Sequence, residues 1–328
     1  MRIVVVGGGS WGTAFACLAA EAGPARLLFR DPSAALAAAR TGRNPRYLPW
    51  LELPSALEVD VVDAPGALDA ADVVAVAVPS HAAAATAGAL ADRLPPGAGV
   101  LSLTKGLDPA TGGRLSSVWR AALGPARPFC ELSGPNHAEE IADRQPTAAV
   151  VAGAPGLAHR IQVRLTGDRF RLYVNDDLPG IELCGAAKNV IAIAAGMTEG
   201  LGYGDNTKAS VITRGLAEMT RLGLASGARA TTFRGLAGVG DLVATCTGRH
   251  SRNRRAGALL AQGVPGDRLE AELGQVVEGM WTAASLLSLA DGVGVELPIS
   301  AEVRAALAGK PPEECLRDLM ARAPRVEE

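Results

Sequence analysis

The chain has 328 residues, of which 48% are hydrophobic, so we expect about two domains with packed cores. Its formal net charge of −2 argues against a protein attracted to nucleic acid or to a membrane surface. The five cysteines are scattered and form no CxxC pair, which predicts a reducing, cytoplasmic setting with neither a metal site nor a disulfide framework.

Short apolar strands alternate with helices along the first half of the chain. The expected strands cover residues 3–6, 27–29, 73–78, 100–103 and 172–174, and the helices between them include 11–22 and 82–94. Continuous apolar strands separated by helices are typical of a parallel sheet covered on both faces. The pattern predicts an α/β, Rossmann-type N-terminal domain with a mostly parallel sheet. Because the first strand begins almost at once, no signal peptide is expected.

The character of the sequence changes near residue 178. Long alanine- and leucine-rich segments separated by glycine loops predict an all-α C-terminal domain. We therefore divide the chain into a dinucleotide-binding domain, residues 1–178, and an all-helical substrate and catalytic domain, residues 179–328. The most apolar stretch, residues 180–204, is interrupted by charged and amide side chains, which argues against a membrane span.

A glycine motif follows the first strand and opens the first helix. Its residues, Gly7-Gly-Gly9-Ser-Trp-Gly12, match the pattern G-x-G-x-x-G of dinucleotide-binding turns. Gly7 would permit the tight turn, Gly9 would let the backbone approach a pyrophosphate, and Gly12 would permit close packing of helix on strand. The phosphates would then lie at the positive end of the helix. An ordinary flexible turn is the alternative, but the position at the start of a βαβ unit favours a cofactor site.

The second strand should end beside the adenosine ribose of such a cofactor, and it ends here in Arg30 and Asp31. An acidic side chain at this place accepts a hydrogen bond from the 2′-hydroxyl of NAD, whereas an arginine pairs with the 2′-phosphate of NADP. We expect Arg30 to face the ribose, which favours NADPH over NADH. The alternative for Asp31 is that it only caps the helix beginning at Pro32.

Two further loops follow apolar segments at the edge of the sheet where ligands collect in α/β proteins. Lys105 lies in the first of these loops, and a solvated loop lysine is the alternative to a role in the site. In the second, Gly134 and Pro135 impose a turn before a helix that begins at Ala138. Backbone at such a helix start can bind a hydroxyl or a phosphate, while a simple turn capped by a side chain such as that of Asn136 is the alternative.

Lysine is scarce in this chain, because 28 of its 32 basic residues are arginine. A lysine kept against that bias is a candidate for a role in which arginine fails, since buried lysine can release its proton. Lys188 lies in the apolar segment 183–197, which predicts a buried helix and a lysine pKa lowered toward neutrality. We expect Lys188 to be the proton-transfer residue. The structural alternatives are an ammonium that reaches solvent or one paired with Glu182 or Glu199.

Two loops of the second half carry further polar groups. The glycine-rich segment 233–242 contains one acid, Asp241, which could cap a helix, hold Lys188 or bind a substrate hydroxyl. The segment 247–255 holds four arginines around Ser251 and Asn253. Arginine binds phosphate through two parallel hydrogen bonds, so this segment is a candidate receptor for a compact dianion. A solvated basic run is the ordinary alternative.

Taken together, these segments resemble the NAD(P)-dependent glycerol-3-phosphate dehydrogenases of the bacterial type, over nearly the whole chain. The resemblance rests on Gly7-Gly-Gly-Ser-Trp-Gly-Thr-Ala14, Asn44-Pro-Arg-Tyr-Leu-Pro49, Val78-Pro-Ser80, Thr104-Lys-Gly-Leu107, Ser133-Gly-Pro135, Gly185-Ala-Ala-Lys-Asn-Val-Ile-Ala192, Thr213-Arg-Gly-Leu-Ala-Glu-Met219, Ala237-Gly-Val-Gly-Asp-Leu242, Ser251-Arg-Asn-Arg-Arg255 and Val276-Val-Glu-Gly279. So many matches in order are far more specific than any one motif.

The resemblance implies an oxidoreductase that interconverts dihydroxyacetone phosphate and sn-glycerol 3-phosphate with NAD(P)H, and it allows a homodimer. It implies that Lys188 is the catalytic proton donor and acceptor. The substrate would be lined by Lys105, Gly134, Asn136, Asp241, Ser251, Arg252 and Asn253. The cofactor, beyond the glycines, would be lined by Ser10, Trp11, Arg30, Lys105, Ala138, Arg252, Val276 and Glu278.

The chain departs from the family pattern after Ser-Gly-Pro. A small hydroxyl residue and a phenylalanine are usual there, whereas this chain has Asn136 and His137. Two other functions stay open on the sequence. One is a β-hydroxyacid or 6-phosphogluconate dehydrogenase of the same architecture, which would also use a lysine on the first helix of the helical domain. The other is a non-catalytic NADPH sensor, which would not need an amine at position 188.

Overall fold

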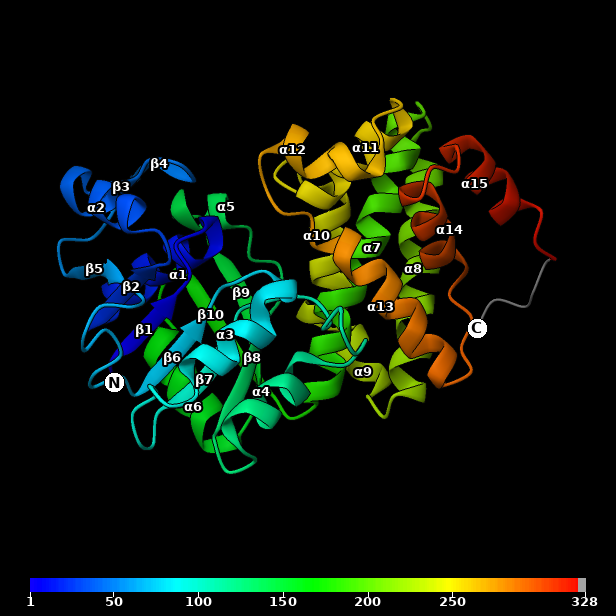
Figure 1. The fold of residues 1–328 in the computed structure, drawn as a ribbon. Helices are drawn as coiled ribbons and strands as arrows, with labels where there is room; N and C mark the ends of the chain where they lie inside the picture. Colours follow the sequence, from blue (N-terminus) through cyan, green and yellow to red (C-terminus); the bar gives the residue numbers. More distant parts are fainter. Residues whose placement is uncertain (324–328) are drawn as a thin grey trace.

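The computed structural model describes residues 1–323, and an eight-stranded sheet forms its N-terminal half (Figure 1). The strand order is β10-β9-β8-β7-β6-β1-β2-β5. The strands are β1 (Ile3–Val6), β2 (Ala25–Phe29), β5 (Leu57–Val61), β6 (Val73–Val76), β7 (Gly99–Ser102), β8 (Phe129–Ser133), β9 (Thr147–Gly153) and β10 (Phe170–Asn175). Neighbouring strands are parallel except β8 and β9, which are antiparallel. The prediction of a mostly parallel sheet is therefore confirmed.

Helices cover both faces of this sheet, because side chains alternate between the faces along each strand. Helices α1 (Ser10–Glu21), α2 (Pro32–Thr41) and α6 (Pro155–Leu165) pack on one face. Helices α3 (Ala83–Leu90) and α4 (Leu115–Leu123) pack on the other, which also belongs to the core of the helical half. A short antiparallel pair, β3 (Arg43–Asn44) and β4 (Leu48–Glu52), stands apart from the sheet, and α5 (Ala138–Ala142) follows β8.

The predicted elements differ from the observed ones mainly at their ends. The expected helix 82–94 is a short turn, η1 (Ser80–Ala82), followed by α3, which ends at Leu90. Of the strands in the main sheet, β5, β8 and β9 were not predicted. β5 alternates polar and apolar residues at a sheet edge, and β8 has a glutamate in its middle. The apolar run of β9 starts with two alanines, which are depleted in strands.

The second half is all helical, as predicted. It contains α7 (Leu178–Gly200), α8 (Asp205–Ala225), α9 (Ala230–Phe233), η2 (Leu236–Gly240), α10 (Asp241–Thr247), α11 (Arg252–Ala261), η3 (Gly266–Arg268), α12 (Leu269–Leu273), α13 (Glu278–Gly292), α14 (Pro298–Leu307) and α15 (Pro312–Met320). Helix α7 runs through the middle of this half (Figure 1). It is long and apolar enough to cross a membrane, but 94% of its most apolar window is buried inside the protein. It is therefore the core helix.

Helices α7 and α11 touch backbone to backbone. A Cβ atom on Gly196 would lie 1.9 Å from the carbonyl oxygen of Arg254, and one on Gly257 would lie 2.0 Å from that of Ile193. No side chain fits at either position, so glycine is required for this close approach. The contact holds the first turn of α11 against α7 and so places two predicted site residues, Ser251 and Asn253, beside the helix that carries Lys188.

Candidate active site

The three glycines of the motif have the local geometry that a dinucleotide-binding turn requires. Gly7 has a φ angle of +121°, and a Cβ atom there would lie 2.3 Å from the carbonyl oxygen of Ala77. A Cβ on Gly12 would lie 1.9 Å from the carbonyl oxygen of Gly7. A Cβ on Gly9, in contrast, would meet nothing within 4 Å. Gly7 and Gly12 are therefore required by the fold itself, whereas the space above Gly9 is open to a ligand.

The start of α1 offers donors to that open space. The helix begins at Ser10, and its N-cap, Gly9, has no side chain to satisfy the first N–H groups. Unpaired N–H groups at a helix start attract anions such as a pyrophosphate. The indole Nε1 of Trp11 is also buried, without a hydrogen-bond partner among the described residues. The residues at this edge thus fit a dinucleotide cofactor.

Asp31 and Arg30 have different surroundings at the end of β2. The Asp31 carboxylate accepts a hydrogen bond of 2.8 Å from the backbone N–H of Ser33 and caps α2. Arg30 is exposed. Asp31 thus caps the helix through one carboxylate oxygen, and Arg30 stays a candidate for the ribose.

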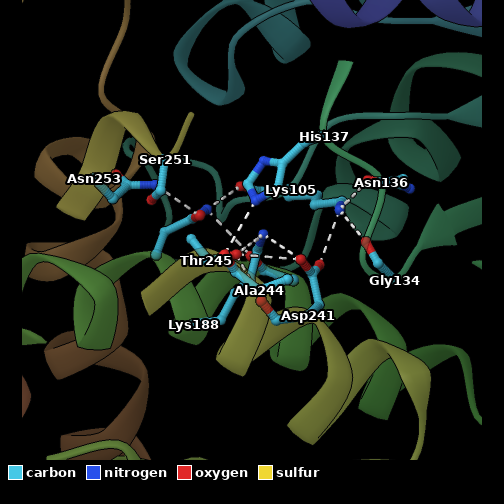
Figure 2. A network of polar contacts seen from close by, with 12 residues as sticks. Lys105, Gly134, Asn136, His137, Lys188, Asp241, Ala244, Thr245, Ser251 and Asn253 are labelled. Carbon is cyan, nitrogen blue, oxygen red and sulfur yellow. Dashed lines mark hydrogen bonds and ion pairs between the residues drawn. The ribbon is translucent and has the colours of Figure 1, made fainter. Parts of the chain in front are cut away.

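Lys188 is buried, with 5% of its surface exposed, and its ammonium has two partners (Figure 2). Its Nζ lies 2.7 Å from Oδ1 of Asp241 and 2.8 Å from Oγ1 of Thr245. The prediction of a buried helix is confirmed, and the solvent-exposed alternative is wrong. The partner is also neither of the glutamates considered, because Glu182 bonds to Ser116 and Glu199 pairs with other basic residues.

Lys105 meets the same carboxylate from the opposite side. Its Nζ donates to Oδ2 of Asp241 at 2.8 Å, to the carbonyl oxygen of Gly134 at 2.8 Å and to Oδ1 of Asn136 at 2.6 Å. The two lysines come from different halves of the chain, so Asp241 joins the loop after β7 to helix α7. Asp241 is the first residue of α10, and its side chain does not act as the cap.

Burial governs the protonation of this cluster. The pKa of Lys188 is lowered from 10.5 to about 8: burial is the largest cause, Lys105 acts in the same direction, and Asp241 acts in the opposite direction. For Asp241, burial alone would raise the pKa, but the two ammonium groups outweigh it and the pKa is lowered. The arrangement therefore keeps a carboxylate charged and leaves Lys188 able to exchange a proton near neutral pH.

Asn189, the residue after Lys188, extends the network toward α11 and α13. Its Nδ2 donates to the backbone oxygen of Lys105 at 2.9 Å, and its Oδ1 accepts from Nδ2 of Asn253 at 2.9 Å. Oδ1 of Asn253 in turn accepts the N–H of Gly279 at 2.9 Å. Asn253, predicted to line the substrate, is thus tied into the scaffold behind the two lysines.

The four arginines of segment 247–255 do not converge on one point. Helix α11 begins at Arg252, with Ser251 as the side-chain cap. The Arg252 guanidinium donates to the carbonyl oxygen of Val276 at 2.9 Å. Arg254 pairs with Glu199, and Arg255 is exposed. The expectation of a four-arginine receptor is therefore wrong, because successive residues of a helix point in different directions. Arg252 and Ser251 stay candidates for substrate binding.

Two of the remaining predicted cofactor residues, Glu278 and Ala138, lie in or against segments that follow strands of the sheet. The buried Glu278 starts α13, and its carboxylate accepts from Oγ of Ser80 at 2.6 Å and from the Ser80 N–H at 3.2 Å. Burial raises the pKa of Glu278. Ala138 begins α5 and packs against Ala14 and Leu48. Glu278 thus links the helical half to the loop after β6.

His137 packs rather than facing open space. Its Nε2 lies 3.1 Å from the carbonyl oxygen of Ala244 in α10 (Figure 2), and burial lowers its pKa, so the ring is neutral at pH 7. Three contributors to the network were not predicted: Thr245, Asn189 and Ser80. Thr245 follows Asp241 by four positions, one turn of a helix, which is a signal that the sequence did contain.

No group of three or more histidine, cysteine, aspartate or glutamate side chains within residues 1–323 could hold a metal ion. The five cysteines are free and buried. The two lysines outside the network are held in ion pairs, Lys208 with Glu199 and Lys310 with Glu302 and Asp318.

Comparison with known proteins covers both halves of the chain. Residues 2–156 match the family model of the NAD-dependent glycerol-3-phosphate dehydrogenase N-terminus, and residues 177–317 match that of its C-terminus. The glycerol-3-phosphate dehydrogenase (NAD(P)+) of Methylococcus capsulatus is 47% identical over 330 residues, covering 99% of this chain and 98% of the relative. That of Moorella thermoacetica is 45% identical, with 99% and 97% covered.

A solved structure agrees with these matches. The crystal structure of glycerol-3-phosphate dehydrogenase from Coxiella burnetii superimposes with a TM-score of 0.93 at 35% identity, covering 98% of this chain and 99% of that one. Sequence matches over the full length and a matching fold leave no room for a different architecture. The chain belongs to the NAD-dependent glycerol-3-phosphate dehydrogenase family.

Proposed function

We propose that this oxidoreductase reduces dihydroxyacetone phosphate to sn-glycerol 3-phosphate, with Lys188 as the residue that protonates the carbonyl oxygen. Membership of the family makes it an NAD(P)-dependent glycerol-3-phosphate dehydrogenase. The observation that carries the role of Lys188 is a buried ammonium with a pKa of about 8, held 2.7 Å from Asp241. A pKa near the working pH is what a group needs to act as an acid in one direction and as a base in the other.

A nicotinamide dinucleotide bound at this site would supply the hydride that reduces the ketone. Lys188 donates its proton to the oxygen as negative charge develops there, and it recovers the proton in the reverse reaction. Asp241 and Thr245 hold the ammonium in place through the chemical step. Proton transfer by a positioned side chain contributes on the order of 10²–10⁴-fold to the rate.

Substrate binding is assigned to the groups around Lys105. Nδ2 of Asn136 is buried without a partner among the described residues, while its Oδ1 is held by Lys105. A buried donor without a partner is costly, so a substrate oxygen is its natural acceptor. We further assign Gly134, Asp241, Ser251, Arg252 and Asn253 to the substrate side, with Arg252 nearest in chemistry to a phosphate receptor.

Cofactor binding is assigned to the glycine turn with Ser10 and Trp11, to Arg30 at the ribose, and to Lys105, Ala138, Arg252, Val276 and Glu278 along the edge of the sheet. NADPH is the preferred cofactor in this proposal, because Asp31 is occupied as a helix cap and Arg30 is not. Initial rates with NADH and NADPH against dihydroxyacetone phosphate test the preference. A higher kcat/KM with NADH would overturn it.

The reaction itself is tested by NADPH oxidation on addition of dihydroxyacetone phosphate. Rapid loss of absorbance at 340 nm is expected for the phosphorylated ketone. A panel that includes 6-phosphogluconate and unphosphorylated β-hydroxyacids, assayed in the oxidative direction, should give no comparable rate. Turnover of one of those compounds in preference to sn-glycerol 3-phosphate would replace the substrate assignment.

Arg252→Ala tests whether Arg252 contributes more to binding the substrate than to binding the cofactor. We expect the KM for dihydroxyacetone phosphate to rise far more than that for NADPH, because a guanidinium that binds phosphate contributes about 1.5–3 kcal/mol. Arg255→Ala is the matched control, because Arg255 lies on the same helix but is exposed. Equal increases in both KM values would count against a substrate-phosphate role.

Three broader proposals follow from the family. The product would supply the backbone of phospholipids, the enzyme would work in the cytoplasm, and two copies would form a homodimer, which light scattering on the purified protein tests. The division into residues 1–178 and 179–328 also stays a proposal. The family models end at 156 and resume at 177, and α7 begins at Leu178, which supports it.

A further inference from the structure

Asn44 belongs to a motif, Asn44-Pro-Arg-Tyr-Leu-Pro49, that has no part in the reaction described above. It ends the short strand β3, outside the main sheet, and only 2% of its surface is exposed. Its Nδ2 donates two hydrogen bonds of 2.8 Å, one to the carbonyl oxygen of Gly8 and one to Oγ1 of Thr13. Both acceptors belong to the glycine turn and the first helical turn of α1, so this side chain reaches from a separate hairpin into the cofactor motif.

The bond to Gly8 fixes a peptide plane rather than a side chain. The C=O of Gly8 and the N–H of Gly9 belong to the same planar peptide, and in a trans peptide they point in opposite directions. No cis peptide occurs in the described chain. Holding the oxygen against Asn44 therefore directs the N–H of Gly9 away from Asn44. Gly9 is the glycine of the motif at which a Cβ atom would meet no protein atom within 4 Å.

Other neighbours also restrict the Gly8–Gly9 peptide. A Cβ atom on Gly8 would lie 2.2 Å from the ring of Phe29, so the turn rests directly on the end of β2. The second bond, to Thr13, connects Asn44 to the helix whose first backbone bond runs from the Thr13 N–H to Gly9 at 2.9 Å. One amide group thus sets both the last peptide of the turn and the first turn of the helix.

The hairpin that carries Asn44 is itself anchored, so it can act as a fixed support. Leu48 is fully buried and packs with Ala14 and Ala138. Nε1 of Trp50 donates to Asp143 at 3.1 Å. These contacts attach the hairpin to α1 and to the segment around α5, as its place beside both elements shows (Figure 1).

We propose that Asn44 is a positioning residue for the cofactor: it holds the Gly8–Gly9 peptide so that the Gly9 N–H donates toward the pyrophosphate. A free Gly8 oxygen could rotate toward the phosphates and repel them, and the amide prevents this. The inference rests on the proposed cofactor site and adds to it a residue outside the glycine motif. It explains why an uncharged amide, with two donors on one nitrogen, is buried at this place.

The test is the affinity of the apo enzyme for NADPH and for ADP-ribose, measured by titration calorimetry. ADP-ribose carries the pyrophosphate but no nicotinamide, so a loss common to both titrants lies at the phosphate end. For Asn44→Ala we expect about tenfold weaker binding of both, since two hydrogen bonds are lost. For Asn44→Asp we expect roughly a hundredfold, because a carboxylate replaces the donors and repels a nearby anion. With saturating NADPH, kcat should stay within about threefold of the wild type.

Arg43→Gln is the matched control. Arg43 precedes Asn44 in the same strand and bonds to Glu52 at 2.6 Å across the hairpin, without touching the glycine turn. Its variant should bind both titrants as the wild type does. Equal losses in Arg43→Gln and Asn44→Ala would mean that the whole hairpin matters, and would overturn the proposal. Unchanged affinity in both Asn44 variants would also overturn it.

Circular dichroism and melting of each apo variant separate positioning from folding. Should the Asn44 variants fail to fold, Thr13→Val decides, because it removes one of the two acceptors that orient the amide. Its affinity for ADP-ribose should fall roughly three- to tenfold, and an unchanged value would overturn the proposal. A wild type that binds ADP-ribose but does not reduce dihydroxyacetone phosphate would refute the proposed reaction and leave this inference standing.

Discussion

The glycine turn and the lysine network, which we assign to one active site, depend on opposite properties. In the turn, Gly7 and Gly12 let backbone atoms come together, and Gly9 leaves space for a ligand. In the network, two ammonium groups share one carboxylate, that of Asp241, so a buried place holds an excess of positive charge. In the proposed function, the turn therefore serves binding through a fixed backbone shape, whereas the network serves chemistry through charges that respond to pH.

The comparison teaches where a substitution should act. A change in the turn should alter affinity for the cofactor and leave the protonation of the site as it was. A change in the network should alter turnover and its pH dependence and leave cofactor affinity largely unchanged. Each of the following experiments would contradict this division if a change in one region produced the effect expected of the other.

Lys188→Arg should have the largest effect. Arginine keeps the positive charge but cannot release a proton, so we expect kcat to fall by about 10²–10⁴-fold. The Kd for NADPH should hardly change. Lys208→Arg is the control, because Lys208 forms its ion pair with Glu199 away from the network. Near-normal turnover by Lys188→Arg in a coupled assay would remove Lys188 from its role.

Asp241→Asn should have the second largest effect. It leaves two ammonium groups facing each other without a carboxylate, so the pKa of Lys188 should fall below its value of about 8. We expect kcat to fall on the order of a hundredfold, with the alkaline loss of kcat/KM for ketone reduction moved to lower pH. Asp267→Asn, on the turn η3, is the control. An alkaline limb at the wild-type pH would show that Asp241 does not govern the proton.

Gly9→Ala and Gly12→Ala divide the turn into its two functions. A Cβ on Gly9 meets no protein atom, so the apo melting temperature should not change while NADPH binding weakens by about tenfold. A Cβ on Gly12 would strike the carbonyl oxygen of Gly7, so that variant should melt at a lower temperature even without cofactor. Equal melting temperatures for the two variants would contradict this division.

The change of the wild-type kcat/KM with pH should be the smallest of these effects. Reduction of the ketone needs Lys188 protonated, so kcat/KM should fall as pH rises through about 8. Oxidation of glycerol 3-phosphate needs the neutral amine, so its kcat/KM should fall as pH drops below the same value. Profiles with the same slope in both directions would show that a different group titrates.

The difference between the two regions also explains how much the sequence could predict. The turn lies within six consecutive residues between a strand and a helix, so its spacing together with that position was enough to predict it. The buried helix around Lys188 was likewise predicted from its apolar composition. Its partner was left open among three acids, because Asp241 lies 53 positions away and only the folded chain brings the two together.

The arginine segment failed for a related reason. Four arginines in nine residues look like one receptor when written in a line, but α11 begins at Arg252 and turns successive side chains to different sides. Arg254 consequently pairs with Glu199, which a linear reading cannot foresee. The hairpin was missed as an element although its motif was noted, since the two residues of β3 are too few for any periodicity.

The scarcity of lysine has a practical consequence for spectroscopy. The chain has four side-chain amines besides its N-terminal one, and two of the four lie in the catalytic cluster. Reductive methylation with carbon-13 formaldehyde would therefore produce a handful of methyl resonances. The resonance from Lys188 should titrate near pH 8 and so report its ionisation without any turnover being measured.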